Sequence, residues 1–254
     1  MHDSPWASEP DSVPIEPAFE PRPFEPPTSA PPKAPPLAGH DEPWTDLRVG
    51  ALADALLRAP ASVLAALRAN PMVGARLALI VVLGLGACGL VMATFSGGLQ
   101  LLFVPVKLIL GMLVCALVCL PSLHVFSCLS GAQQTVRETW GAMLMGIALM
   151  GMLLVGFAPV LWIFGQATHS IALMGALHLC FFLISAGFGL GLSLRALSRM
   201  NDAPVRAGGL WAVMFVCVLL QMSTTLRPLV GPFDGVLFHE RLFFVGHWFQ
   251  TLGS

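Results

Sequence analysis

Long runs of apolar residues, separated by short polar connections, dominate the chain after residue 76. A helix needs about 20 predominantly apolar residues to cross a bilayer, and five runs approach or exceed that length. The pattern predicts five transmembrane helices, over Leu77–Phe95, Leu99–Leu120, Trp140–Phe164, Ile171–Leu194 and Gly209–Leu226. We therefore expect an all-α fold, a polytopic integral membrane helix bundle that contacts the lipid bilayer.

The composition agrees with this class and separates a polar head from the apolar body. Of the 254 residues, 56% are hydrophobic and 11% charged, whereas a soluble domain is about 25% charged. The head (residues 1–43) is acidic and holds 13 of the 21 prolines. Proline removes a backbone donor and favours extended neighbours, so we predict a disordered cytoplasmic tail with polyproline II character.

Two roles are open for this head. It is either a docking strip for a proline-recognising or basic partner, or a solvated tether. Residues 1–39 begin without basic residues and contain no apolar run, so they lack the pattern of a secretory signal.

Residues 44–70 place leucines at helical spacing among charged residues, and Pro60 predicts a break between two short amphipathic helices. The segment either lies in the membrane interface or packs on the cytoplasmic face of the bundle. In the first case Arg58, Arg68 and Arg76 are candidate interfacial anchors, because arginines there meet anionic headgroups.

The segment after the last span has its own predicted structure. Pro228, Gly231 and Pro232 predict a turn, and Val236–Phe249 has the pattern of an amphipathic helix on the outer side, with Trp248 as a candidate interfacial anchor. The predicted organisation is a tail over 1–43, interfacial helices over 44–70, a five-helix domain over 71–226 and an outer segment over 227–254.

Basic residues predict the orientation. Arg48, Arg58, Arg68 and Arg76 lie between the head and the first span. The second-to-third and fourth-to-fifth connections carry Arg137, Arg195, Arg199 and Arg206. The two intervening connections have no Lys or Arg, so the basic side is expected to be cytoplasmic and the carboxyl terminus outside. Arginine outnumbers lysine 11 to two, and Ala, Leu and Gly dominate the sequence, which favours a GC-rich bacterial source and its cytoplasmic membrane.

Polar residues at membrane depth are the candidates for chemistry, because burying them in lipid is costly. The candidate polar membrane site consists of Lys107, His178, Gln221, Thr224, Thr225 and Arg227. Lys107 and the last four are expected near the outer ends of the second and fifth spans. The alternative is that Lys107 extends to the interface and that His178 is a hydrogen-bonded packing residue. No Asp or Glu lies within a span, which weakens a proton- or cation-coupled transporter.

Several motifs argue against other classes. Gly84–Gly89 matches G-x-G-x-x-G but lies in the middle of a span, with no strand before it. Close helix packing explains these glycines better, together with those of the third and fourth spans: Gly146, Gly151, Gly156, Gly187, Gly189 and Gly191. The six cysteines form no CxxC pair and are interpreted as packing residues. We expect no enzyme activity, metal, cofactor or nucleic-acid partner.

A family resemblance comes from Leu123–Trp140, where a helix end rich in leucine and aromatic residues meets Gly131, a short polar turn, and Arg137 with Thr139. This stretch resembles the corresponding part of the Yip family of Ypt/Rab-interacting membrane proteins, which also have five spans and a cytoplasmic head. The resemblance implies a non-enzymatic adaptor, here a bacterial relative whose partners are not Rab GTPases.

The leading hypothesis is therefore a membrane scaffold or adaptor that organises membrane or recruits protein partners through its head or its bundle. The alternative is a small-solute transporter or channel subunit that uses the polar membrane site. Assembly into a homo- or hetero-oligomer stays open.

Overall fold

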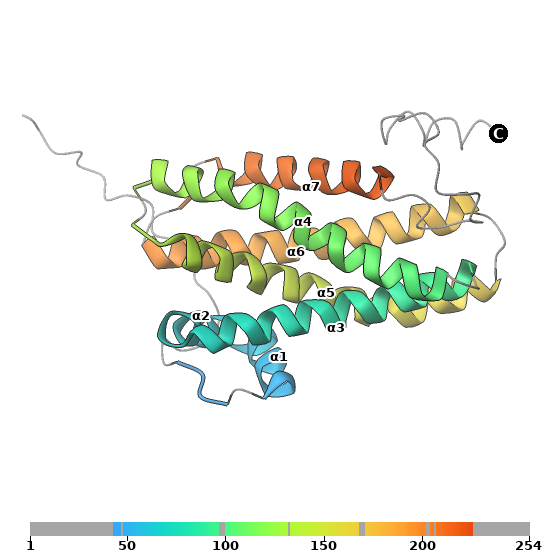
Figure 1. The fold of residues 1–254 in the computed structure, drawn as a ribbon, viewed down its shortest axis with the longest axis horizontal. Coiled ribbons are helices and arrows are strands. Elements are labelled where there is room, and N and C mark those ends of the chain that lie inside the picture. Colours follow the sequence, from blue (N-terminus) through green and yellow to red (C-terminus); the bar gives the residue numbers. More distant parts are fainter. Residues whose placement is uncertain are drawn as a thin grey trace, which may run out of the picture. The chain divides into compact units, whose positions relative to one another are not determined.

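The computed structural model describes residues 43–46, 48–96, 100–131, 133–167, 171–201, 204–205 and 207–225. Over these residues the chain contains helices and no strand, which confirms the all-α prediction (Figure 1). The helices are α1 (Val49–Arg58), α2 (Pro60–Ala69), α3 (Pro71–Ser96), α4 (Gln100–Leu129), α5 (Val136–Ala167), α6 (Ile171–Asn201) and α7 (Gly208–Thr225).

Four of these helices, α3 to α6, are long and apolar enough to cross a bilayer, which indicates an integral membrane protein. They continue beyond the predicted spans, most clearly in α4, where the predicted span ends at Leu120 and the helix runs through Pro121 to Leu129. The apolar run marks the part of a helix that suits hydrocarbon, not the point where the helix stops. That point is set by Gly131, whose φ of 85° few other residues adopt.

Helices that follow one another in the chain alternate in direction from α3 to α7, as their short connections require. Helices α5 and α6 are antiparallel: Phe157 stacks on Phe181 with ring centroids 4.4 Å apart, while Gly146, earlier in α5, lies against Gly189, later in α6. Helices α3 and α5 run parallel, because Gly84 lies against Gly151 while residues nearer both helix starts line one pocket. Helix α7 lies antiparallel to the carboxyl-terminal half of α4 (Figure 1).

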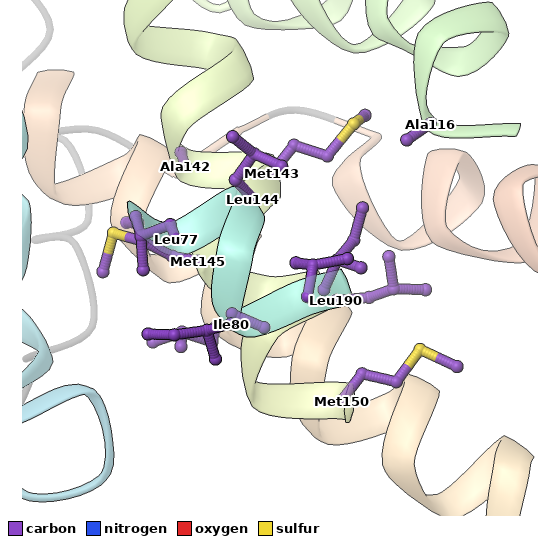
Figure 2. Close-up of a cluster of buried hydrophobic side chains, with 14 of the residues drawn as sticks. Leu77, Ile80, Ala116, Ala142, Met143, Leu144, Met145, Met150 and Leu190 are labelled. Carbon is purple, nitrogen blue, oxygen red and sulfur yellow. The ribbon is translucent and has the colours of Figure 1, made fainter. Parts of the chain in front are cut away.

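Helix α5 forms the centre of the core. It packs along α3 and α6 and also contacts α1, α2 and α4. Figure 2 shows Met145 of α5 beside Leu77 of α3, and Met143 of α5 extending toward Ala116 of α4; all four residues are buried. The unbranched methionine side chain adapts to irregular gaps, which suits a helix that contacts several neighbours.

The prediction that glycines permit close helix packing is confirmed at four of the nine positions: Gly84, Gly89, Gly146 and Gly189. A Cβ on Gly84 would lie 3.0 Å from the backbone of Gly151, and one on Gly89 would lie 2.7 Å from Cα of Pro105. Gly146 lies against the carbonyl oxygen of Gly189.

At Gly156 and Gly187 the prediction is wrong, because a Cβ there would meet nothing within 4 Å. Gly86 and Gly191 have ordinary spacing to a neighbouring side chain, 3.6 Å in each case.

Helices α1 and α2 pack against α3 and α5. The break between them falls at Ala59, next to Pro60, where the sequence predicts it. Helix α2 buries residues on nearly all its sides, including Val63 and Leu67. Ahead of them, the backbone N–H of Trp44 donates to the carbonyl of Ser62 over 3.2 Å. This packing favours the second alternative for residues 44–70, since protein covers the leucines that an interfacial helix would turn toward lipid.

Residues 1–42 and 226–254 lie outside the described part. The predicted tail, the outer helix over Val236–Phe249, Arg227 and Trp248 therefore stay predictions.

Candidate functional site

Polar contacts gather at one end of the bundle, where α3, α5 and α7 begin and α4 and α6 end. We call it the basic end, because it carries Arg68, Arg76, Arg137, Arg195 and Arg199. At this end a turn follows α4, in which the N–H of Gly131 donates to the carbonyl of Cys128 over 2.9 Å. This bond and the positive φ of the glycine terminate α4 and direct the chain toward α5.

The start of α5 is fixed by a reciprocal cap between Thr135 and Glu138. The backbone N–H and the hydroxyl of Thr135 donate to Oε2 of Glu138 over 2.9 and 3.0 Å, and the N–H of Glu138 donates to the Thr135 hydroxyl over 3.3 Å. Such a capping box satisfies backbone donors that the first helical turn leaves without partners.

Thr139, one turn further along α5, connects this cap to α4. Its hydroxyl is buried and lies 3.1 Å from Nδ1 of His124, while Nε2 of His124 lies 3.7 Å from the sulfur of Cys128. The amide of Gln134 approaches the same hydroxyl at 3.4 Å and accepts from Asn201 at the end of α6. The network therefore joins α4, α5 and α6.

Arg68 joins α2 to the same network. Its Nε donates to Oε1 of Glu138 over 3.0 Å, so the two carboxylate oxygens of Glu138 serve α2 and the α5 cap at once. The Arg68 side chain is 54% exposed and that of Glu138 23%. The contact joins segments that are 70 residues apart in the sequence, so it adds a polar link between α2 and α5 to the apolar packing of the amino-terminal helices.

Beside this ion pair lies a pocket of about 500 Å³ between α2, α3 and α5. Its polar lining comes from Arg68, Thr135, Arg137 and Glu138. Its apolar lining consists mostly of small residues, with two leucines and one tryptophan: Leu67, Pro71, Gly74, Ala75, Ala78, Trp140, Gly141 and Leu144. The pocket thus has a charged part at the end of α2 and the start of α5, and an apolar part further along α3 and α5.

The predicted polar membrane site is only partly described. Lys107 lies half-buried in the first part of α4, the part that packs on α3 through Pro105 and Ile109. His178 lies in α6 and its Nδ1 donates to the carbonyl of Met174 over 2.7 Å, one turn earlier. That bond within one helix is typical of a packing histidine, although its buried Nε2 has no partner among the described residues.

Gln221, on α7, is exposed, and Thr224 and Thr225 end the described part of that helix. Helices α4 and α7 are antiparallel, since Nε1 of Trp211 donates to the carbonyl of Cys119 and the sulfur of Cys115 lies 3.9 Å from the carbonyl of Phe215. This register brings Gln221 to the same end of the bundle as Lys107. Their association with Arg227 stays a prediction.

Sequence reasoning missed the polar network. It treated residues 123–140 as a family resemblance and did not recognise the T-x-x-E pattern of Thr135 to Glu138, a readable capping signal. The contacts of Arg68 with Glu138 and of Asn201 with Gln134 had no local signal, because they join distant segments.

The comparisons with known proteins add no relative: no family model, no curated protein and no solved structure matches the chain. The case for a function therefore depends on the residues and their geometry. The six cysteines are free thiols, with Cys88, Cys115 and Cys119 buried in the helix packing.

Proposed function

We propose that the protein is a non-enzymatic membrane scaffold or adaptor whose acidic, proline-rich head recruits protein partners. The observation that carries the proposal is the attachment of the segment that follows the head. Trp44 bonds to Ser62 of α2, and α2 is joined to α5 by the ion pair of Arg68 with Glu138. A recruiting segment benefits from such a fixed point, because every partner it captures is then held at the basic end of the bundle.

The interior of the described bundle also supports a scaffold. Backbone contacts of Gly84 with Gly151 and of Gly146 with Gly189 bring α3, α5 and α6 together, and methionine and leucine side chains fill the space around them. Close packing through small residues is how membrane helices associate stably. A transporter would have to separate these contacts to open a path for a solute.

We place α7 as a fifth span. Its 18 residues extend about 27 Å at 1.5 Å per residue, close to the roughly 30 Å hydrocarbon core of a bilayer. One face buries Trp211 and Phe215 against α4, while Leu210, Val213 and Met214 are 59%, 60% and 47% exposed. An apolar outer face on a packed helix suits contact with acyl chains.

The basic end is then cytoplasmic, because positively charged residues are retained on that side. The head lies inside and the carboxyl terminus outside, in a membrane that we take to be the bacterial cytoplasmic membrane. The resemblance of Leu123–Trp140 to the Yip family agrees with an adaptor role and with this topology. In a bacterium the recruited partners are proteins other than Rab GTPases.

A head replacement tests the proposal. Tagged full-length protein is compared in mild detergent with a variant in which residues 1–39 are replaced by a Gly/Ser linker of equal length, and co-purifying proteins are identified by mass spectrometry. The matched control is Arg58→Gln, which removes an exposed ion pair with Asp54 on α1 but leaves the head intact. Recruitment by the head predicts partners that are lost with the linker and retained in the control.

A further inference from the structure

The pocket between α2, α3 and α5 has a chemistry that the adaptor role does not use. Its volume of about 500 Å³ lies in the range of small-molecule sites, roughly 300–1,000 Å³. Two arginines and one carboxylate line its polar part, so positive charge exceeds negative charge there by one.

The carboxylate is already used within the protein. Oε1 of Glu138 accepts from Arg68, and Oε2 accepts from the backbone N–H and the hydroxyl of Thr135. The guanidinium of Arg137 is exposed and has neither a hydrogen bond nor an ion pair with any residue that the structure describes. Its five N–H donors suit bidentate contacts to a phosphate.

The apolar part of the pocket points to an amphiphile rather than a small anion. Leu144 lies seven residues beyond Arg137, which is about 10 Å along α5, and Trp140 lies between them, where an aromatic ring suits the membrane interface. On α3, Ala75 and Ala78 line the pocket, and Leu79 and Val82, four residues further on, are 44% and 37% exposed. The pocket therefore continues into an apolar strip on the outside of α3.

We propose that this pocket binds the phosphate headgroup of an acidic phospholipid, with Arg137 as the principal contact and an acyl chain along Ala75, Ala78, Leu79 and Val82. Basic pockets between membrane helices on the cytoplasmic side are a common mode of acidic lipid recognition. The charged part of the pocket lies nearer the end of the bundle and the apolar part lies deeper, in the same order as the phosphate and the acyl chain of a lipid in a bilayer leaflet. A lipid in this place contacts α2, α3 and α5 together and stabilises the junction that carries the head.

The test uses full-length protein in nanodiscs of phosphatidylcholine that contain a minor fraction of phosphatidylglycerol. Protein-bound lipid is counted by native mass spectrometry after release from the disc. Arg137→Gln is compared with Arg195→Gln, which removes an exposed arginine at the same end of the bundle but outside the pocket. One charge-assisted contact predicts about tenfold weaker retention of phosphatidylglycerol in Arg137→Gln, and about unchanged retention in Arg195→Gln.

A second variant separates a lipid from a free anion. Ala75→Leu adds bulk to the apolar part and leaves the charges in place, so it is expected to weaken phosphatidylglycerol retention as well. Inorganic phosphate and glycerol 3-phosphate are added as soluble competitors, and neither is expected to displace the lipid. Equal retention of phosphatidylglycerol and phosphatidylcholine, equal effects of the two arginine variants, or displacement by inorganic phosphate would each overturn the proposal.

Discussion

The guanidinium of Arg68 on α2 and the carboxylate of Glu138 at the start of α5 lie 3.0 Å apart, although 70 residues separate them in the chain. The pair connects the segment that follows the head to α5, the helix at the centre of the core. Because the same carboxylate also takes part in the α5 cap, one side chain contributes both to the attachment of α2 and to the start of α5. The basic end is thus a connected unit rather than a set of separate loops.

The α5 cap predicts that two substitutions lower the free energy of unfolding by different amounts. Thr135→Ala removes the side-chain acceptor of the cap and is expected to lower the free energy of unfolding by about 1 kcal/mol. Glu138→Gln keeps a side chain that can accept from the Thr135 N–H and loses only a partly exposed ion pair, so its cost is expected to stay below about 1 kcal/mol. Unfolding in mixed micelles measures both, and a larger loss in Glu138→Gln would contradict the assignment of Thr135 as the cap.

The glycine contacts predict that an added methyl group is harmful at one position and harmless at another. Gly146→Ala places a Cβ against the Gly189 carbonyl and is expected to cost about 1–3 kcal/mol through overpacking. Gly187→Ala, on the open side of α6, meets nothing within 4 Å and serves as the control. Thermal unfolding of the two variants in the same detergent compares them. Equal melting temperatures would mean that α5 and α6 are not in backbone contact.

The orientation can be tested at Cys128, an exposed thiol at the end of α4. In a variant that keeps Cys128 and replaces the other five cysteines with alanine, a membrane-impermeant maleimide is expected to label inverted vesicles but not intact cells. Gln166→Cys in a cysteine-free background, at the opposite end of α5, is expected to give the reverse pattern. Labelling of Cys128 in intact cells would reverse the proposed topology.

A substitution of Lys107 distinguishes the scaffold proposal from the transporter alternative. In liposomes, the wild-type protein and Lys107→Gln are expected to show the same solute permeability as empty vesicles, and the variant is expected to keep its partners. Arg227→Gln is measured beside it. A flux in the wild type that either substitution abolishes would favour a transporter with its site near the outer ends of α4 and α7.

Much of the fold follows from the sequence, because apolar length and helix-breaking residues are local signals. The all-α class and the division between α1 and α2 next to Pro60 could be predicted in this way. The ends of the apolar spans predicted the helix ends less accurately: the second span was predicted to end at Leu120, whereas α4 continues to Leu129, just before Gly131. The polar network could not be predicted, because whether His124 meets Thr139, or Asn201 meets Gln134, depends on tertiary packing of helices whose register no local pattern encodes.

For the same reason the sequence left two positions open for residues 44–70, the membrane interface and the cytoplasmic face of the bundle. An amphipathic helix has the same sequence pattern whether its apolar face meets lipid or protein. Only the tertiary structure shows that Leu52, Leu56 and Val63 are buried, where α1 and α2 pack on each other and on α3 and α5.

The head replacement tests the central claim most directly. Full-length protein and the variant with a Gly/Ser linker in place of residues 1–39 are purified side by side, after equal melting temperatures have shown that both bundles are intact. A recruiting head predicts that the same proteins co-purify with the full-length chain and with the Arg58→Gln control, and that they are absent from the linker variant. Identical partners for all three, or none for any, would contradict the claim that the head recruits them.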